Sequence, residues 1–331
     1  MNPNAGIWPP NYTAGDKAAK FHENSLIINT MNQFKQRSLM TSILVAFALA
    51  FVTGNVSAIE KIKRNGPSKV KIGLNCYSFN QPLIAKTMTV EEMFRISASI
   101  GFDAVDLTGY YFSTYPAVPS DEEIYRYKKT AFLLGLDISG TGVRNDFTIA
   151  DPEKRKAEVQ LVKDWIIVAA KLGAPVIRVF AGKEVPEGFT RSQVVAWMVK
   201  DLEECAAFGA KYGVMVGVQN HNDFLKTAAD VEEILQKVKS EWFGLILDIG
   251  SFRTIGDPYK EIAQVVPYAI NWQIKETVFI NNKETKTDMK KMAEIFRNSG
   301  YSGYIPIETL GAGDPKEKIT RFYKEVKLAV Q

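Results

Sequence analysis

Several short apolar stretches of this sequence end in residues that can transfer protons, hold anions or ligate cations. Carboxylates and histidine exchange protons near neutral pH, lysine and arginine bind developing or permanent negative charge, and carboxylate and amide oxygens suit hard divalent cations. The pattern therefore indicates acid–base chemistry, with or without a bound metal. The residues concerned are Asp106, Arg178, Gln219, His221, Asp248, Asn271, Gln273, Lys275 and Glu308.

The stretches that carry these residues alternate with amphipathic, helix-like segments from Lys69 onward. Glycines that suit helix ends precede most of the strands, and helix starts carry capping-box patterns at 89–92, 120–123 and 190–193. Pro152 and Pro258 stand at first-turn positions. The predicted strands are 71–76, 104–108, 137–141, 176–180, 215–220, 243–248, 269–275 and 304–308, and the helix-ending glycines are Gly101, Gly135, Gly173, Gly213 and Gly303.

Eight strand–helix repeats over residues 69–331 predict one domain, a (β/α)8 TIM barrel. An open, doubly wound sheet with eight strands is the alternative. In a barrel, alternate strand residues point inward, and the last inward positions line a pocket at the carboxyl ends of the strands. On this rule Asn271, Gln273 and Lys275 face inward, whereas Trp272 and Ile274 face outward. Buried polar groups cost several kcal/mol unless they find partners, so we expect them to have a function.

The first 68 residues differ from the rest. Residues 1–30 show no periodicity and form an unstructured extension, with Met31 as an alternative start. Residues 31–58 combine basic residues, an apolar run from Met40 to Val52 and a small-residue site, which predicts a signal peptide and a periplasmic or secreted protein. An uncleaved anchor is the alternative. Residues 59–68 are expected to be a linker, and no stable membrane insertion is expected after cleavage.

The net charge of +4 lies in this amino-terminal part, because the first 68 residues hold seven of the 41 Lys and Arg but only three of the 37 Asp and Glu. The predicted barrel is therefore neutral, and we expect no nucleic-acid partner. A multi-zinc endonuclease needs a cluster of histidines, and this class is excluded because His221 is the only histidine of the predicted barrel. Cys76 and Cys205 have no paired spacing and are expected to be buried thiols.

Four segments resemble the last four strands of xylose isomerase-like sugar isomerases and epimerases. They are GVMVGVQNHNDF (213–224), GLILDIGSFR (244–253), INWQIKE (270–276) and YIPIETL (304–310). The resemblance implies a barrel that acts on a carbohydrate and uses a divalent cation, Mn²⁺ or Mg²⁺. By position, the metal ligands would be Gln219, Asp248, Gln273 and Glu308.

The sequence departs from this family pattern at two of these positions and at a third position nearby. Gln219 stands where the family has an acidic residue, Gln273 where it has histidine, and Ser251 where a histidine is frequent. Amide oxygens can still ligate Mg²⁺ or Mn²⁺. The alternative is a metal-free pocket in which Gln219 and Gln273 hydrogen-bond to each other and to Asp248.

Glu308 is the expected base, His221 a second group for proton transfer, and Lys275 a stabiliser of oxyanions. Arg178, Tyr77, Phe79, Asn145 and Ser251 are expected to contact substrate, although Arg178 could instead form a structural ion pair. Gly311 and Gly313 are interpreted as a plain turn.

These residues predict an isomerase or epimerase that removes a proton next to a carbonyl of a non-phosphorylated sugar. Because Gln219 cannot take a proton, a lyase or hydrolase that expels the C1 substituent of a 3-keto-glycoside is a second hypothesis. A non-catalytic sugar-binding barrel is the third. The sequence allows a homo-oligomer and does not identify the sugar.

Overall fold

The computed structural model describes residues 61–64 and 66–330, all within the compact unit that spans Ser57–Gln331. The predicted extension (1–30) and signal peptide (31–58) lie outside the described residues. The described part of the predicted linker contacts the barrel, since Ile62 N donates to Pro267 O at 2.9 Å and Arg64 Nη2 to Ala269 O at 2.5 Å. Within residues 61–64 and 66–330, none of the helices has the length and apolar character to cross a bilayer.

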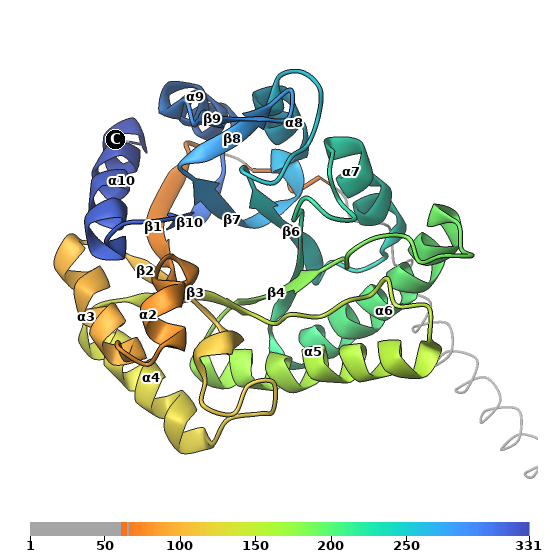
Figure 1. The fold of residues 1–331 in the computed structure, drawn as a ribbon, viewed down its shortest axis with the longest axis horizontal. Helices are drawn as coiled ribbons and strands as arrows, with labels where there is room; N and C mark the ends of the chain where they lie inside the picture. The colour runs from red at the N-terminus through yellow and green to blue at the C-terminus, as the bar shows by residue number, and fades with distance from the viewer. Residues whose placement is uncertain (1–60, 65, 331) are drawn as a thin grey trace, which may run out of the picture. The chain divides into compact units, whose positions relative to one another are not determined.

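Eight parallel strands close into a barrel (Figure 1). The strand order around the barrel is β1-β10-β7-β6-β5-β4-β3-β2, so the first and last strands pair along a register from Lys69–Ser302 to Leu74–Ile307. This closure confirms the (β/α)8 prediction and excludes the open sheet. The strands are β1 (Lys69–Asn75), β2 (Ala104–Thr108), β3 (Asp137–Gly142), β4 (Val176–Phe180), β5 (Met215–Gln219), β6 (Phe243–Asp248), β7 (Ala269–Lys275) and β10 (Ser302–Glu308).

Helices surround the barrel and start where the capping patterns predict. Thr89 and Thr190 form complete capping boxes, and Asp151 caps a helix that opens with Pro152. The principal helices are α3 (Val90–Ile100), α4 (Asp121–Leu133), α5 (Pro152–Leu172), α6 (Arg191–Tyr212), α7 (Ala228–Lys237), α8 (Pro258–Val265), α9 (Met289–Ser299) and α10 (Pro315–Val330), and the short ones are α2 (Asn80–Ile84), η1 (Cys76–Phe79), η2 (Gly109–Tyr111) and η3 (Val266–Tyr268).

Two local predictions are wrong, and one element of the structure was not predicted. Gly300, with φ of 62°, ends α9, whereas Gly303 already lies in β10. Ser120 caps α4, but the Glu123 carboxylate bonds to Ser113 instead of closing a capping box. A hairpin, β8 (Thr277–Ile280) and β9 (Lys283–Lys286), stands between β7 and α9.

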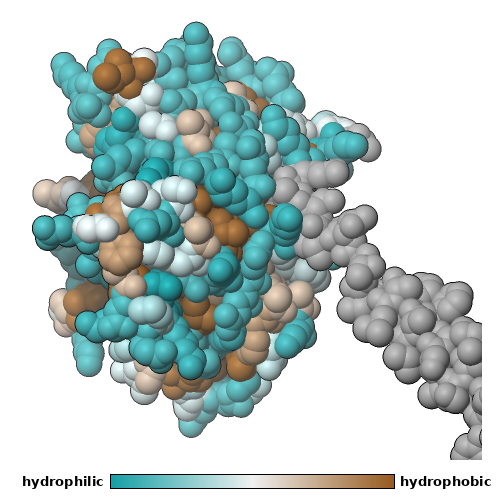
Figure 2. Space-filling view, turned by 90° about the vertical axis from the view of Figure 1, so that its right-hand side faces the viewer, coloured by the Kyte–Doolittle hydropathy of each residue, from teal (hydrophilic) through white to brown (hydrophobic). Residues whose placement is uncertain are grey.

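The alternation of side chains along β7 follows the inward–outward rule. Trp272 packs outward against Phe296 of α9, with ring centroids 5.0 Å apart, and is fully buried. Asn271 points inward and donates to Ser139 O at 3.3 Å and to Asp106 at 3.4 Å. The side of the domain seen in Figure 2 is largely hydrophilic with scattered apolar residues, as expected for outer helix surfaces. Polar side chains thus lie both on the outer surface of the domain and, as Asn271 and Asp106 show, inside the barrel.

Candidate active site

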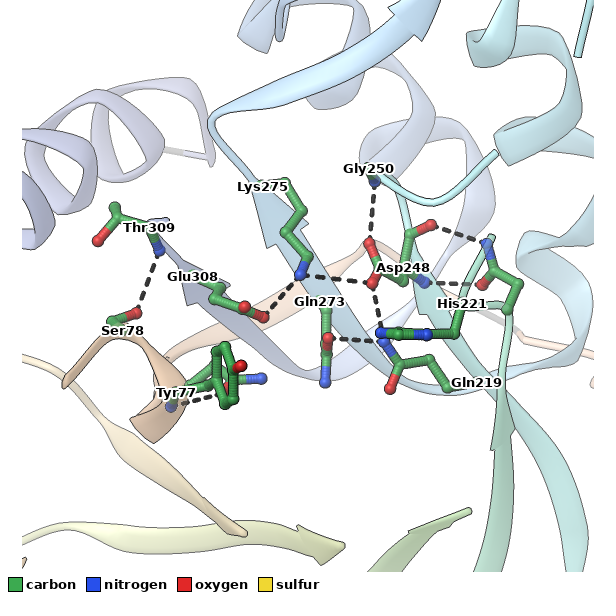
Figure 3. Close-up of polar contacts among 12 residues, drawn as sticks. Tyr77, Ser78, Gln219, His221, Asp248, Gly250, Gln273, Lys275, Glu308 and Thr309 are labelled. Carbon is green, nitrogen blue, oxygen red and sulfur yellow. Dashed lines mark hydrogen bonds and ion pairs between the residues drawn. The ribbon is translucent and has the colours of Figure 1, made fainter. Parts of the chain in front are cut away.

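Five of the predicted residues meet at the carboxyl-terminal mouth of the barrel, although they come from four strands (Figure 3). They are Gln219 of β5, Asp248 of β6, Gln273 and Lys275 of β7, and Glu308 of β10. All five are largely buried, and the Asp248 side chain has no exposed surface. The last inward position of each strand thus contributes to a single polar cluster.

Gln219 connects two of its neighbours through its amide nitrogen. Nε2 donates to Asp248 Oδ2 at 2.8 Å and to Gln273 Oε1 at 2.9 Å. The backbone N–H of Gly250 donates to the other Asp248 oxygen at 3.0 Å. Asn220 fixes β5 to β6, because its side chain exchanges hydrogen bonds with the Asp248 backbone at 2.8 and 2.9 Å. Asp248 is therefore held by neutral donors on two sides.

Lys275 extends between the two carboxylates. Its Nζ lies 2.8 Å from Glu308 Oε2 and 3.5 Å from Asp248 Oδ2. Burial alone would lower the pKa of Lys275, but the charges of Asp248 and Glu308 outweigh it and raise the pKa from 10.5 to about 12. A side chain at Gly250 would collide with the stem of Lys275, since its Cβ would lie 2.6 Å from Lys275 Cγ. Glycine at 250 is thus what allows Lys275 to reach this place.

The donor set does not fit a divalent cation as arranged. Gln219 presents N–H groups rather than oxygen to Asp248, the Gln273 oxygen accepts from Gln219, and the ammonium of Lys275 already neutralises Glu308. A second cation there would be repelled by Lys275. Among the described residues, no cluster of three or more His, Cys, Asp and Glu side chains could hold a metal. The expected ligands Gln219, Asp248, Gln273 and Glu308 do converge, but they surround an ammonium group.

His221 lies at the rim, and its side chain is 48% exposed. Its ring packs against Phe180, with centroids 4.6 Å apart, and Nδ1 lies 3.4 Å from Asp223 Oδ2. The residue lies two positions beyond the end of β5 and lines the mouth without joining the buried cluster. It can therefore exchange protons with solvent or with a bound molecule.

Two cavities open at the mouth, and His221, Lys275, Glu308 and Leu310 line both. The first, of about 290 Å³, extends under the β8–β9 hairpin and is called here the hairpin cavity; its other lining residues include Ser251, Arg253, Phe279 and Glu284. The second, of about 250 Å³, extends over β2, β3 and β4 and is called the arginine cavity; its other lining residues include Tyr77, Thr108, Tyr110, Arg144 and Arg178. Glu308 and Lys275 line both cavities, so a molecule bound in either cavity could contact them.

The structure places Tyr77, Ser251 and Arg178 on cavity walls, but Phe79 and Asn145 elsewhere. Phe79 is fully buried in the hydrophobic core, because the chain turns into η1 after β1 and the period-two rule no longer holds. Asn145 is buried and exchanges hydrogen bonds with the Phe180 backbone at 2.8 and 2.9 Å. These two positions correct the expectation of substrate contact: both side chains are used by the fold itself.

The alternative of a structural ion pair for Arg178 is also corrected. Among the described residues, no carboxylate lies within 4.0 Å of its guanidinium, which donates instead to Val143 O at 2.7 Å and to the Tyr110 hydroxyl at 3.0 Å. Asp106 lies deeper in the barrel, and burial raises the pKa of Asp106 from 3.8 to about 7. The charge of Arg178 acts on Asp106 and partly opposes this rise, but the guanidinium forms no ion pair and still lines the cavity.

Sequence reasoning missed Thr108, Tyr110 and Arg253 as lining residues. Tyr110 is the second residue after β2, as Tyr77 is the second residue after β1, so the same rule of aromatic residues after a strand could have found it. Arg253 stacks on Phe279 of the hairpin, with Cζ 3.5 Å from the ring centroid. Nothing in the sequence placed these two side by side, because the hairpin itself was not predicted.

Comparison with known proteins agrees with this geometry. The family described as Xylose isomerase-like TIM barrel matches residues 94–325. The chain belongs to this family. Its members are mostly sugar isomerases and epimerases and are commonly metal-dependent. None of the curated proteins matches the sequence.

Similar solved structures share the fold at low sequence identity. A D-psicose 3-epimerase from Clostridium cellulolyticum H10, solved with D-tagatose, has a TM-score of 0.65 and 16% identity, with 79% of this chain and 99% of that chain covered. A 3-keto-D-glucoside 4-epimerase from E. coli has a TM-score of 0.64 and 16% identity, covering 78% and 100%. A sugar phosphate isomerase/epimerase from Parabacteroides distasonis has a TM-score of 0.61 and 17% identity, covering 83% and 99%. At these identities the likeness concerns the fold.

Proposed function

We propose that this chain is an enzyme that isomerises or epimerises a non-phosphorylated sugar by moving a proton next to a carbonyl group. The observation that carries the proposal is the Glu308–Lys275 pair, which lies where the two cavities of the barrel mouth meet. Membership of a family of sugar isomerases and epimerases supports the substrate class. The proposal includes no step through a metal, because the donor set does not fit one.

Glu308 acts as the base in this proposal. Its carboxylate takes the proton from the carbon next to the carbonyl, and the electron pair of that C–H bond moves to form an enediolate. Lys275 donates a hydrogen bond to the carbonyl oxygen and stabilises the charge that develops on it. For isomerisation, the proton returns to the former carbonyl carbon, while the proton of the neighbouring hydroxyl passes to the former carbonyl oxygen and a new carbonyl forms. For epimerisation, a proton reaches the same carbon from the other face and the original carbonyl forms again.

Return from the other face requires a second group, and His221 is the candidate. It lines both cavities and is accessible to solvent, so it can supply a proton that did not come from Glu308. Gln219, at the position where the family has an acid, cannot do so. Epimerisation therefore depends on His221, whereas isomerisation needs Glu308 alone.

Glutamine at position 219, where the family has an acid, also favours a second candidate function. Elimination of the C1 substituent from a 3-keto-glycoside needs one base, because the ketone acidifies the neighbouring C–H bond and the leaving group departs from the adjacent carbon. Glu308 would take that proton and Lys275 would bind the ketone oxygen. The same two residues thus support a lyase with a different product.

Deuterium exchange tests the common step. The protein is incubated with free ketoses, aldoses and 3-keto-glycosides in D2O, and deuterium at the carbon next to the carbonyl is followed by NMR and mass analysis. We expect exchange with the wild type and an exchange rate lower by about 10²-fold or more in Glu308→Gln. Glu294→Gln, a control that removes an exposed carboxylate from α9, should exchange at the wild-type rate. A rearranged sugar indicates an isomerase or epimerase, and a released aglycone indicates a lyase. Tight sugar binding without any exchange would refute both and leave a sugar-binding barrel.

A further inference from the structure

One wall of the arginine cavity carries positive charge without a matching acid. We call this wall the arginine wall and define it as Thr108, Tyr110, Arg144 and Arg178, from the carboxyl ends of β2, β3 and β4. Among the described residues, Glu308 is the only carboxylate that lines the cavity, and it already pairs with Lys275. Asp106 does not line the cavity but interacts electrostatically with Arg178, so the charge of Arg144 and part of that of Arg178 remain for whatever binds there.

Arg178 is held rigidly in the wall. It is 6% exposed, and its guanidinium lies over the Phe180 ring, 4.1 Å from the centroid. Its two hydrogen bonds go to a carbonyl and a hydroxyl, both neutral. Glycine at 142 makes room for it, since a Cβ there would lie 2.8 Å from Arg178 Nε. A buried guanidinium so placed costs free energy unless an anion compensates it.

Arg144 approaches the same aromatic ring from the adjacent loop. Its guanidinium lies 5.3 Å from the Tyr110 ring centroid, and that of Arg178 lies 5.6 Å from it. Among the described residues, no carboxylate lies within 4.0 Å of Arg144 either. Two cations that share one ring and have no acid beside them repel each other until an anion binds.

Thr108 supplies an independent sign of a missing ligand. Its side chain is 3% exposed, it lines the same cavity, and its hydroxyl has no hydrogen-bond partner in the described part of the chain. A buried hydroxyl without a partner is destabilising, because it has given up its hydrogen bonds to water. A ligand oxygen in the cavity would satisfy it.

We propose that the arginine wall binds the acid group of a sugar acid, with the carboxylate between Arg144 and Arg178. This inference rests on the proposed function, because it names the substrate class of that same site. Guanidinium groups bind carboxylates through paired hydrogen bonds and are selective for them over neutral hydroxyls. The other end of the sugar then reaches Glu308 and Lys275, which border the cavity.

Titration calorimetry with matched sugars tests the inference. D-glucuronate is compared with D-glucose, and D-galacturonate with D-galactose, while D-glucose 6-phosphate and inorganic phosphate distinguish a carboxylate from a phosphoryl group. We expect each sugar acid to bind about tenfold or more tightly than its neutral partner. Arg144→Gln, an exposed position, should weaken only the acids by about tenfold. Arg178→Lys keeps the charge but loses the paired donors and should weaken the acids as well. Arg297→Gln, on the surface of α9, should change nothing.

Equal or tighter binding of the neutral sugars would overturn the inference, and so would acid binding that survives both wall variants. Tighter binding of glucose 6-phosphate than of glucuronate would overturn the carboxylate assignment. Failure of this inference is distinguishable from failure of the proposed function. If neutral sugars exchange deuterium while sugar acids neither bind nor exchange, the inference about the arginine wall is refuted and the proposed function is not. If sugar acids bind through the arginine wall without exchange, the proposed function is refuted and the binding of acids is not.

Discussion

Replacement of Lys275 by methionine is the most direct test of the polar cluster. The change keeps most of the side-chain volume but removes the ammonium that lies 2.8 Å from Glu308 and 3.5 Å from Asp248. The rise of the Lys275 pKa from 10.5 to about 12 corresponds to about 2 kcal/mol of net stabilisation of the charged form by the fold. Removal of one partner of a buried ion pair costs about 3–5 kcal/mol, because the other charge is left uncompensated. We therefore expect the free energy of unfolding to fall by about 3–5 kcal/mol.

The two carboxylates should respond differently to this loss. Asp248 keeps hydrogen bonds from Gln219 and from the Gly250 N–H, whereas the Glu308 side chain bonds only to Lys275 among the described residues. Adding Glu308→Gln to Lys275→Met should therefore restore more than half of the lost stability, and adding Asp248→Asn should restore less. The two second-site variants form a matched pair for a double-mutant cycle.

Urea unfolding at pH 7 and pH 9, followed by circular dichroism, measures these values. A lysine whose folded pKa is raised contributes stability that is fully present below 10.5 and is lost as the pH rises through about 12. The loss in Lys275→Met should thus be the same at both pH values. Lys290→Met, at an exposed position of α9, is the control and should stay within about 0.5 kcal/mol of the wild type. A loss below about 1 kcal/mol in Lys275→Met, or equal rescue by both second-site changes, would refute the reasoning, since either result falls outside the cost of breaking a buried pair.

Three further predictions concern the metal, the deeper barrel and the packing of a helix. Chelator treatment should leave the melting temperature and activity of the wild type unchanged, whereas millimolar Mn²⁺ should stabilise Lys275→Met. Metal analysis that finds one tightly held divalent ion in the wild type would contradict this prediction. Burial raises the pKa of Asp106 to about 7, so its neutral form contributes stability that is fully present below about pH 4 and lost as the pH rises through about 7. Between pH 5 and pH 8 the free energy of unfolding of the wild type should therefore fall by roughly 3 kcal/mol more than that of Asp106→Asn. The same pH dependence of this free energy in both proteins would disprove the prediction. Gly209→Ala raises helix propensity, but its Cβ would lie 2.3 Å from Val214 O, so we expect a loss of about 1–3 kcal/mol in chemical unfolding rather than a gain.

The strands and most caps could be predicted because their signals are local. β-branched runs with period two placed Asp248 and Gln273 at the mouth, and the same rule correctly turned Trp272 outward. The rule fails where the strand ends, and for this reason Phe79, the last residue of a helical turn, was assigned to the pocket although it lies in the core.

The arrangement within the cluster could not be predicted in the same way. Whether Lys275 or a metal neutralises the carboxylates depends on the space left by Gly250, two residues after a different strand. The hairpin β8–β9 had a local signal that was not used: Asn281 and Asn282 have φ of 50° and 61°, and paired asparagines favour this kind of tight turn. Arg144 and Arg178 come from segments whose proximity only the closed barrel establishes.

Pairing of the first and last strands has a consequence for synthesis of the chain. The backbone N–H of Lys69 in β1 donates to Ser302 Oγ, across a separation of 233 residues. At roughly 5–20 residues per second, a ribosome takes on the order of ten to fifty seconds to make that interval. During this time one edge of β1 has no strand to pair with, and an unpaired edge invites pairing with other chains. A nascent barrel of this kind is thus most exposed to aggregation just before its last strand emerges.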